Sequence, residues 1–281
     1  MTVRIVTDST ADMPAEMAQE LGIPVVPLSV VFGEESLKEG SEISHDVFYE
    51  RLARSKKELP TTSSPSVGDF LDTYRDVLKE TDEIVSVHLS SKLSATYSAA
   101  TQAAAILAEE GARIEVVDSR TVSLGMMFLC QAAVKAAAEG ASVEEIREII
   151  DDMSPRISVY VVLDTLEYVR RGGRIGRARA FLGTMLRVKP ILSFDGGEVH
   201  PEERVRTRSL ALDRLFQMVT SNPKIEEVGV AYSINAEEAE GLRQRLSEAL
   251  GGMDVQMTRI GAVAGVHGGP GVLGVGFLRG E

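Results

Sequence analysis

The amino-acid sequence predicts an α/β protein of two lobes, and three observations indicate this fold class. Over the first 155 residues, short apolar runs alternate with segments of helical periodicity, which is typical of a doubly wound, mainly parallel, Rossmann-like sheet. After Pro155 a hairpin signal is mixed with strand–helix units, which predicts a mixed α/β lobe. Because the sequence contains no repeat and no low-complexity linker, we expect the lobes, residues 1–155 and 156–281, to pack against each other.

Four apolar runs predict the strands of the N-terminal lobe, at residues 3–7, 25–32, 84–89 and 114–117. Pro27 lacks the N–H that the interior of a sheet requires, so the second run is expected to form an edge strand or an irregular one. The last two runs should each be followed by a helix.

Helix signals separate these runs. The first predicted helix covers residues 14–21. Ser64-Pro65-Ser66 predicts the start of another helix, because a capping hydroxyl often precedes a proline at the first helical position. Ser142 and Glu145 form a capping box for the last helix of the lobe, which should end near Asp152.

The C-terminal lobe should begin with a strand at residues 157–163 and a helix from Thr165 that Gly172-Gly173 interrupts. Asp195-Gly196-Gly197 predicts a hairpin between strands at 188–194 and 198–202. The other predicted elements are a helix with an apolar stripe at Leu212, Leu215, Phe216 and Val219, a strand at 228–232, a helix capped by Asn235, and strands at 255–260 and 272–278.

Composition limits the classes of function. The 281 residues carry 42 acidic and 30 basic side chains, and a net charge of −12 argues against general affinity for nucleic acid. No apolar run reaches the roughly 18 residues that a membrane span needs, so stable membrane insertion is not expected. The first residues have a strand pattern and no signal-peptide character, which favours a cytoplasmic location. Cys130 lies alone in an apolar run and should be a buried thiol.

Several catalytic and cofactor motifs are missing from the sequence. The four histidines are far apart, and no Cys/His cluster or HExxH motif indicates zinc. The sequence also has no P-loop, no GxSxG elbow and no GxGxxG loop after its first strand. We therefore expect neither a metal nor a cofactor, and no catalytic residue.

Hydroxyl side chains gather where predicted strands meet helices, at residues 7–10, 61–64, 90–96 and 118–121. In a doubly wound sheet, ligands bind outside the carboxyl ends of the strands, and helix N-termini attract anions. Two such corners facing each other could bind a carboxylate without lysine or arginine. The alternative is that each hydroxyl only caps its own helix, and the residues alone leave both interpretations open.

The ordered motifs resemble those of the DegV family, bacterial fatty-acid-binding proteins that serve as subunits of fatty acid kinase. They span nearly the whole chain and include IVTDSTADMP, PTTSSPS, LSSKLSATYSAA, VVDSRTVSLG, LEYVRRGGRIG and GPGVLGVGF. The resemblance implies a DegV-like fold whose C-terminal lobe completes a lipid pocket. It also implies a carrier that is not itself an enzyme and holds a long-chain fatty acid, with its carboxylate between hydroxyls of two loops. A separate kinase catalytic subunit would phosphorylate that carboxylate to an acyl-phosphate.

The resemblance places the carboxylate ligands at Thr62 and Ser94, with His267 near the same group. Two positions depart from the family pattern, since Ser64 replaces the usual glutamine and Ala95 the usual glycine. Neither change removes a proposed hydroxyl. Ala95 could restrict how closely its backbone approaches the head group.

Arginines cluster in the C-terminal lobe, at residues 170, 171, 174, 177 and 179 and again at 204, 206 and 208. In an acidic chain this clustering favours a docking surface for the kinase, or contacts to the acyl-phosphate, by Arg170, Arg204 and Arg206. The alternative is a solvated face with dispersed ion pairs.

Two other function classes remain open at this level. An enzyme acting on a small phosphorylated or carboxylated metabolite could use the same anion site. A purely structural interaction protein would leave the hydroxyl-rich corners unexplained.

Overall fold

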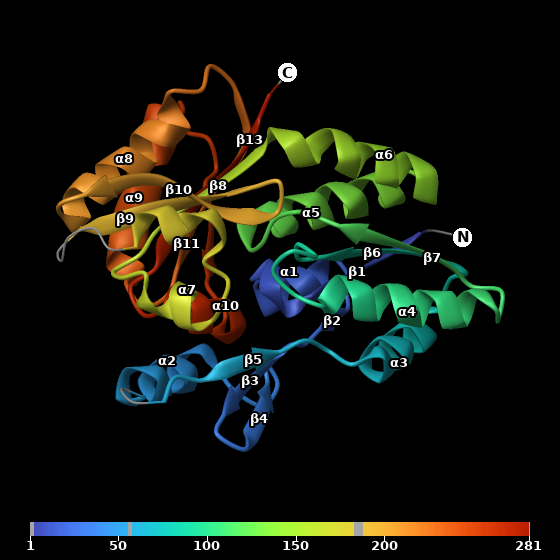
Figure 1. Ribbon diagram of the computed structural model, residues 1–281. Helices are drawn as coiled ribbons and strands as arrows, with labels where there is room; N and C mark the ends of the chain where they lie inside the picture. The colour runs from blue at the N-terminus through green and yellow to red at the C-terminus, as the bar shows by residue number, and fades with distance from the viewer. Residues whose placement is uncertain (1–2, 56–57, 183–187, 281) are drawn as a thin grey trace.

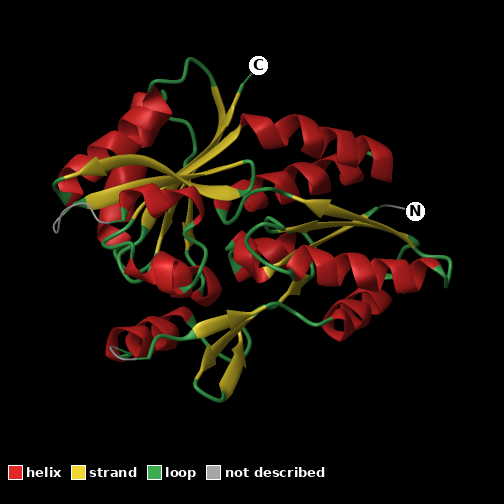
Figure 2. Cartoon of the chain, viewed as in Figure 1, coloured by secondary structure: helices red, strands yellow, loops and turns green. Residues whose placement is uncertain are grey.

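The computed structural model describes residues 3–55, 58–182 and 188–280, and these residues form three sheets with helices packed around them (Figure 1). Figure 2 shows the strands of each sheet in yellow. The α/β class is confirmed, with one parallel sheet and one mixed sheet. Among the helices of the described segments, none combines the length and the apolar character needed to cross a bilayer.

The first sheet is parallel throughout and has the doubly wound arrangement. Its strands, in spatial order, are β2 (Val25–Val26), β1 (Arg4–Asp8), β6 (Glu83–His88) and β7 (Arg113–Asp118). The helices of this lobe are α1 (Ala15–Glu20), α3 (Val67–Val77), α4 (Thr96–Ala108), α5 (Leu124–Ala138) and α6 (Val143–Met153).

Alternation along the strands separates two apolar layers. Ile5 packs with residues of α5 and α6 on one face, while Val6 packs with Phe70 of α3 and Ala100 of α4 on the other. Successive side chains of a strand point to opposite faces, so one short strand serves both layers. The predicted doubly wound lobe is therefore confirmed.

The second sheet has six strands, all from residues after 156. In spatial order they are β10 (Glu198–Val205), β9 (Lys189–Asp195), β8 (Ile157–Val162), β13 (Leu273–Arg279), β11 (Ile225–Tyr232) and β12 (Gln256–Arg259). Only β11 and β12 are parallel neighbours. The predicted hairpin is present, and Gly196 and Gly197 both have positive φ, as a type I′ turn requires.

One face of this sheet is covered by α8 (Arg208–Thr220) and α9 (Ala236–Ala249). The other face meets α5, whose Leu124, Met127 and Phe128 are almost completely buried against it. Gly276 allows this close approach, because a Cβ there would lie 2.7 Å from the Leu124 Cβ. Since α5 packs on both sheets, it joins the two lobes. The lobe boundary at residue 155 stays a prediction.

A third, antiparallel sheet corrects the prediction of one strand at residues 25–32. Before Pro27 the chain forms β2 beside β1 in the parallel sheet. After Pro27 it leaves that sheet and enters β3 (Ser29–Phe32), which pairs with β4 (Glu35–Lys38) and β5 (Thr61–Ser63). The helix α2 (His45–Arg54) packs beside this sheet. Proline has no N–H to donate to a ladder, and the change of sheet follows directly after it.

Two predicted caps differ in detail. Ser66, and not Ser64, caps α3: its Oγ accepts from the Asp69 N–H at 3.1 Å, so Pro65 lies outside the helix. Asn235 stands at the N-cap of α9 but donates to Glu238 at 3.1 Å and accepts no helix N–H. The capping box of Ser142 and Glu145 is confirmed.

The remaining helices are short. The predicted helix from Thr165 is α7 (Glu167–Arg171), which ends at Gly172, and α10 (Ala262–Gly268) was not predicted. The described residues also form 3-10 helices at Ser9–Ala11, Ser154–Arg156 and Gly176–Phe181. Cys130 is completely buried, as predicted.

Candidate functional site

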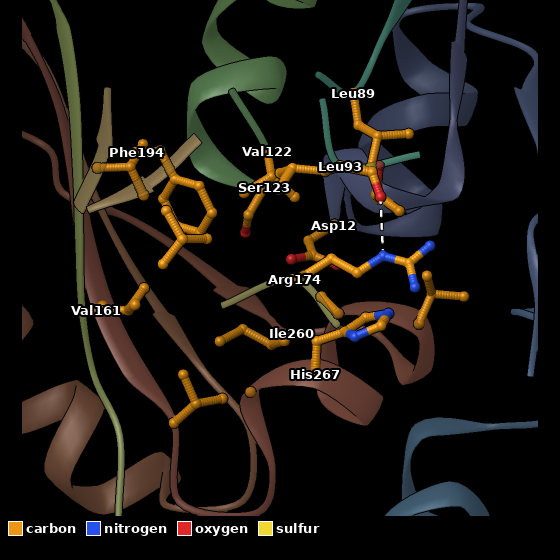
Figure 3. Close-up of a pocket in the computed structure, with 18 of the residues that line it drawn as sticks. Asp12, Leu89, Leu93, Val122, Ser123, Val161, Arg174, Phe194, Ile260 and His267 are labelled. Atoms are coloured by element: carbon orange, nitrogen blue, oxygen red, sulfur yellow. Dashed lines mark hydrogen bonds between the residues drawn. The ribbon is translucent and has the colours of Figure 1, made fainter. Parts of the chain in front are cut away.

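A cavity of about 130 Å³ lies between the two lobes and the third sheet. Of its 26 lining residues, 17 are apolar and 7 are polar. Figure 3 shows Phe194 and Val161 toward one end and Leu93, Arg174 and His267 toward the other. The cavity is therefore a mainly apolar chamber with a polar end.

Thr62, Ser94 and His267 all line this cavity, so the fold brings the three predicted ligand residues together. Thr62 lies on β5 and His267 on α10, and Thr62 Oγ1 lies 3.1 Å from His267 Nε2. Ser94 precedes α4 and exchanges a hydrogen bond of 2.9 Å with the Thr96 hydroxyl. These groups can donate hydrogen bonds to an anion at the N-terminal end of a helix.

Apolar packing holds the His267 side of this end in place. One apolar core joins α10 to the third sheet and to α2. It contains Val263 and Val266 of α10, Val30 of β3, Leu28 just before β3, and Phe48 of α2. This contact explains why Thr62 and His267 meet although the sequence separates them by 205 residues.

The His267 ring is neutral at pH 7. Burial, and then the positive charge of Arg174, lower the pKa of His267 to about 4. Gly172 makes room for the ring, because a Cβ at that position would lie 2.2 Å from His267 Nδ1. His267 therefore carries a single N–H, and with this proton on Nε2 it can donate to Thr62 Oγ1 and leave the Thr62 hydroxyl free to donate to a ligand.

Arg174 supplies the positive charge at this end. Its Nε donates to the Leu93 carbonyl at 3.0 Å and its Nη1 to the Gly172 carbonyl at 2.8 Å. Among the described residues that line the cavity, it is the only cation. The sequence placed Arg174 in the arginine cluster and not at the site, since Leu93, which is 81 residues away, becomes its neighbour only in the fold.

The two departures from the family pattern have simple consequences. Ala95 has φ −78 and ψ 0, a conformation open to any residue, so alanine is not strained there. Ser64 is not among the described residues that line the cavity.

The predicted docking arginines lie outside the cavity lining. Arg170 and Arg206 are exposed and form no ion pair with another described residue, while the Arg204 guanidinium lies 4.8 Å from the centre of the Phe181 ring. Arg171 pairs with Glu167 at 2.7 Å, and Arg208 binds Glu238 and the Gly271 carbonyl. The cluster thus divides into arginines with structural partners and arginines that face solvent.

Another hydroxyl-rich corner is structural. Asp8, Ser86 and His88 are completely buried, and His88 links Asp8 at 2.9 Å to the Ser86 hydroxyl at 2.7 Å. Tyr74 donates to Ser86 and completes this buried chain. The arrangement has the residue types of a hydrolase triad, but no substrate can reach its serine.

Comparison with known proteins identifies the family. The family model described as "Uncharacterised protein, DegV family" matches residues 2–280. The chain belongs to the DegV family. It is 40% identical over 277 residues to a DegV domain-containing protein of Streptomyces coelicolor, covering 97% of each chain.

Two solved structures share the fold. DegV of Bacillus subtilis, described as a fatty acid binding protein, is 34% identical with a TM-score of 0.90 and 100% of each chain covered. A stearic-acid-binding protein of Eubacterium ventriosum is 27% identical, with a TM-score of 0.92 and coverage of 99% of this chain and 98% of its own. The DegV-like fold expected from the sequence motifs is confirmed.

Proposed function

We propose that this DegV protein binds one long-chain fatty acid, with the hydrocarbon chain in the cavity and the carboxylate at Thr62, Ser94 and His267. The observation that carries this proposal is the polarity of the cavity, whose apolar walls end at a cluster of hydrogen-bond donors. The solved relatives that bind fatty acid support the same ligand class.

The tail provides most of the binding free energy. A buried methylene contributes about 0.8 kcal/mol, so a chain of about 14 methylenes could contribute roughly 11 kcal/mol as an upper bound. A hydrogen bond to a charged group contributes about 1.5–3 kcal/mol. The donors at the polar end therefore orient the head group and offset its desolvation, while the apolar wall determines affinity.

The negative charge of a carboxylate head group is complementary to the hydrogen-bond donors and the arginine at the polar end of the cavity. A carboxylate placed there would lie between the Thr62 and Ser94 hydroxyls, near the neutral His267 and the fixed Arg174 guanidinium. The alternative function, an enzyme acting on a small phosphorylated or carboxylated metabolite, would leave 17 apolar lining residues without a ligand surface to cover.

The carrier would present its fatty acid to a fatty acid kinase catalytic subunit, which would convert the carboxylate to an acyl-phosphate. Arg170, Arg204 and Arg206 lie outside the cavity lining and can meet an acidic partner or the new phosphate. Such contacts chiefly speed association and weaken with salt.

The test replaces Arg170, Arg204 and Arg206 singly with alanine and measures fatty acid binding and kinase-dependent phosphorylation separately. We expect unchanged lipid affinity and several-fold slower phosphorylation at low salt, with the difference shrinking as salt rises. Arg171→Ala is the matched control, because Arg171 is already paired with Glu167 on the same helix. Wild-type phosphorylation rates in all three variants across the salt series would exclude this docking surface.

A further inference from the structure

Two polar side chains line the cavity away from its polar end. Asp12 and Ser123 have exposed fractions of 6% and 8%, and Figure 3 shows their oxygens pointing into the space between Phe194 and Arg174. Within the described part of the chain, neither Asp12 Oδ2 nor Ser123 Oγ makes a hydrogen bond of normal geometry, although the Ser123 hydroxyl lies close enough to Asp12 to lower the pKa of its carboxyl. A buried polar atom without a partner is uncommon in folded proteins and indicates a role for the group.

Ser123 stands at the N-cap of the 15-residue helix α5 but does not cap it. Its N–H donates to the Thr10 carbonyl at 2.8 Å and its own carbonyl accepts from the Met127 N–H at 3.0 Å. These bonds hold the residue at φ 55 and ψ −128, a rare conformation for a residue other than glycine. The backbone is fixed, and the hydroxyl is left facing the cavity.

Asp12 is held in a similar way by one of its oxygens. Its Oδ1 accepts from the Gly261 N–H at 2.9 Å, which leaves Oδ2 for the cavity. Burial, and then the negative charge of Glu39, raise the pKa of Asp12 to about 8, so its carboxyl is mostly protonated at pH 7. A protonated carboxyl can both donate and accept a hydrogen bond.

The neighbouring charges determine which ligand group fits here. Glu39 is buried beside Asp12 and binds the Val263 N–H at 2.9 Å. A mainly protonated Asp12 beside the partly ionised Glu39 offers no positive charge to a carboxylate or a phosphate, so the ligand group at this point is uncharged. A hydroxyl, with one donor and two acceptor sites, complements a carboxyl and a serine.

We propose that Asp12 and Ser123 form a subsite that binds a hydroxyl carried on the hydrocarbon chain of the ligand. The inference rests on the proposed function and extends it, because it adds hydroxylated long-chain fatty acids to the ligands. An internal hydroxyl would be costly to bury in an apolar chamber, and these two side chains provide its hydrogen bonds at one depth only.

The test compares stearic acid with isomeric monohydroxystearic acids in a displacement assay against a fluorescent fatty acid. The hydroxyl position is scanned along the chain. We expect one isomer to bind about tenfold more tightly than the others. In Ser123→Gly that isomer should fall to the level of the others, while stearate affinity stays within about twofold. Glycine readily adopts the positive φ of this position, so the variant should fold.

Ser94→Ala is the control at the head group, and it should weaken stearate and every hydroxy isomer by the same factor. The inference is overturned if stearate binds but every isomer binds more weakly without a positional preference, or if the preference survives in Ser123→Gly. If neither stearate nor any isomer binds, the proposed function fails together with the inference. The positional scan of the wild-type chain decides the outcome even without a variant.

Discussion

Thr62 and His267 meet at the polar end of the cavity, where Ser94 provides a second hydroxyl. Neutral donors can bind a carboxylate there because Arg174 supplies charge nearby and α4 begins beside Ser94. Each hydroxyl should therefore contribute a hydrogen bond to a charged group.

We expect Thr62→Ala and Ser94→Ala each to weaken fatty acid binding by roughly ten- to a hundredfold, the equivalent of about 1.5–3 kcal/mol. Titration with a fluorescent fatty acid measures the change. Thr61→Ala and Ser98→Ala are matched controls, since both side chains are exposed neighbours outside the cavity lining. Wild-type affinity in both Thr62→Ala and Ser94→Ala would remove these hydroxyls from the site.

For individual residues, the sequence identified some members of the candidate site and missed others. Thr62, Ser94 and His267 follow from motifs, and the fold places all three at one end of the cavity. Asp12 was not among the predicted site residues, because its partner Gly261 is 249 residues away in the sequence. Ser123 gave no signal, because its unused hydroxyl results from a backbone conformation that tertiary contacts impose.

At the scale of elements, α10 depends on two buried acids. The Gly261 N–H at its start binds Asp12, and the Val263 N–H in its first turn binds Glu39. The pKa of Asp12 is raised to about 8 and that of Glu39 to about 7, in both cases chiefly by burial. The folded chain thus retains protons that the unfolded chain releases, and its stability should fall as pH rises through these values.

We expect the free energy of unfolding to decrease by about 1–3 kcal/mol between pH 6.5 and 8.5, and Asp12→Asn to reduce this slope. The pKa of His267 is lowered from 6.5 to about 4 by folding, so this group makes stability rise slightly near pH 6.5, against the trend set by the two acids, and has little effect at the upper end of this window. Urea unfolding at several pH values measures the slope. Glu34→Gln, at an exposed position, is the control and should keep it. Equal slopes in the wild type and Asp12→Asn would contradict this account of α10.

Local signals predicted most elements, and the exceptions have local causes. Apolar runs located the strands of the parallel sheet, and Asp195-Gly196-Gly197 located the hairpin. The segment at residues 25–32 divided because Pro27 cannot continue a ladder. The helix α10 was missed because its seven residues end in glycine and its first turn is stabilised by distant carboxylates.

At the scale of the whole molecule, α5 lies between the two main sheets, and the cavity opens beside its N-terminus. The cavity walls come from strands, helices and loops that are spread between residues 10 and 274. No periodicity in the sequence can identify such a lining, since every apolar helix and strand is a candidate until the fold selects among them.

Mass spectrometry of lipids extracted from the purified chain tests the carrier function most directly. We expect about one long-chain fatty acid per chain, and a higher unfolding temperature when palmitate is added to the extracted protein. A chain that is recovered without fatty acid, and whose unfolding temperature does not change with palmitate, would contradict the proposal that the cavity holds a fatty acid.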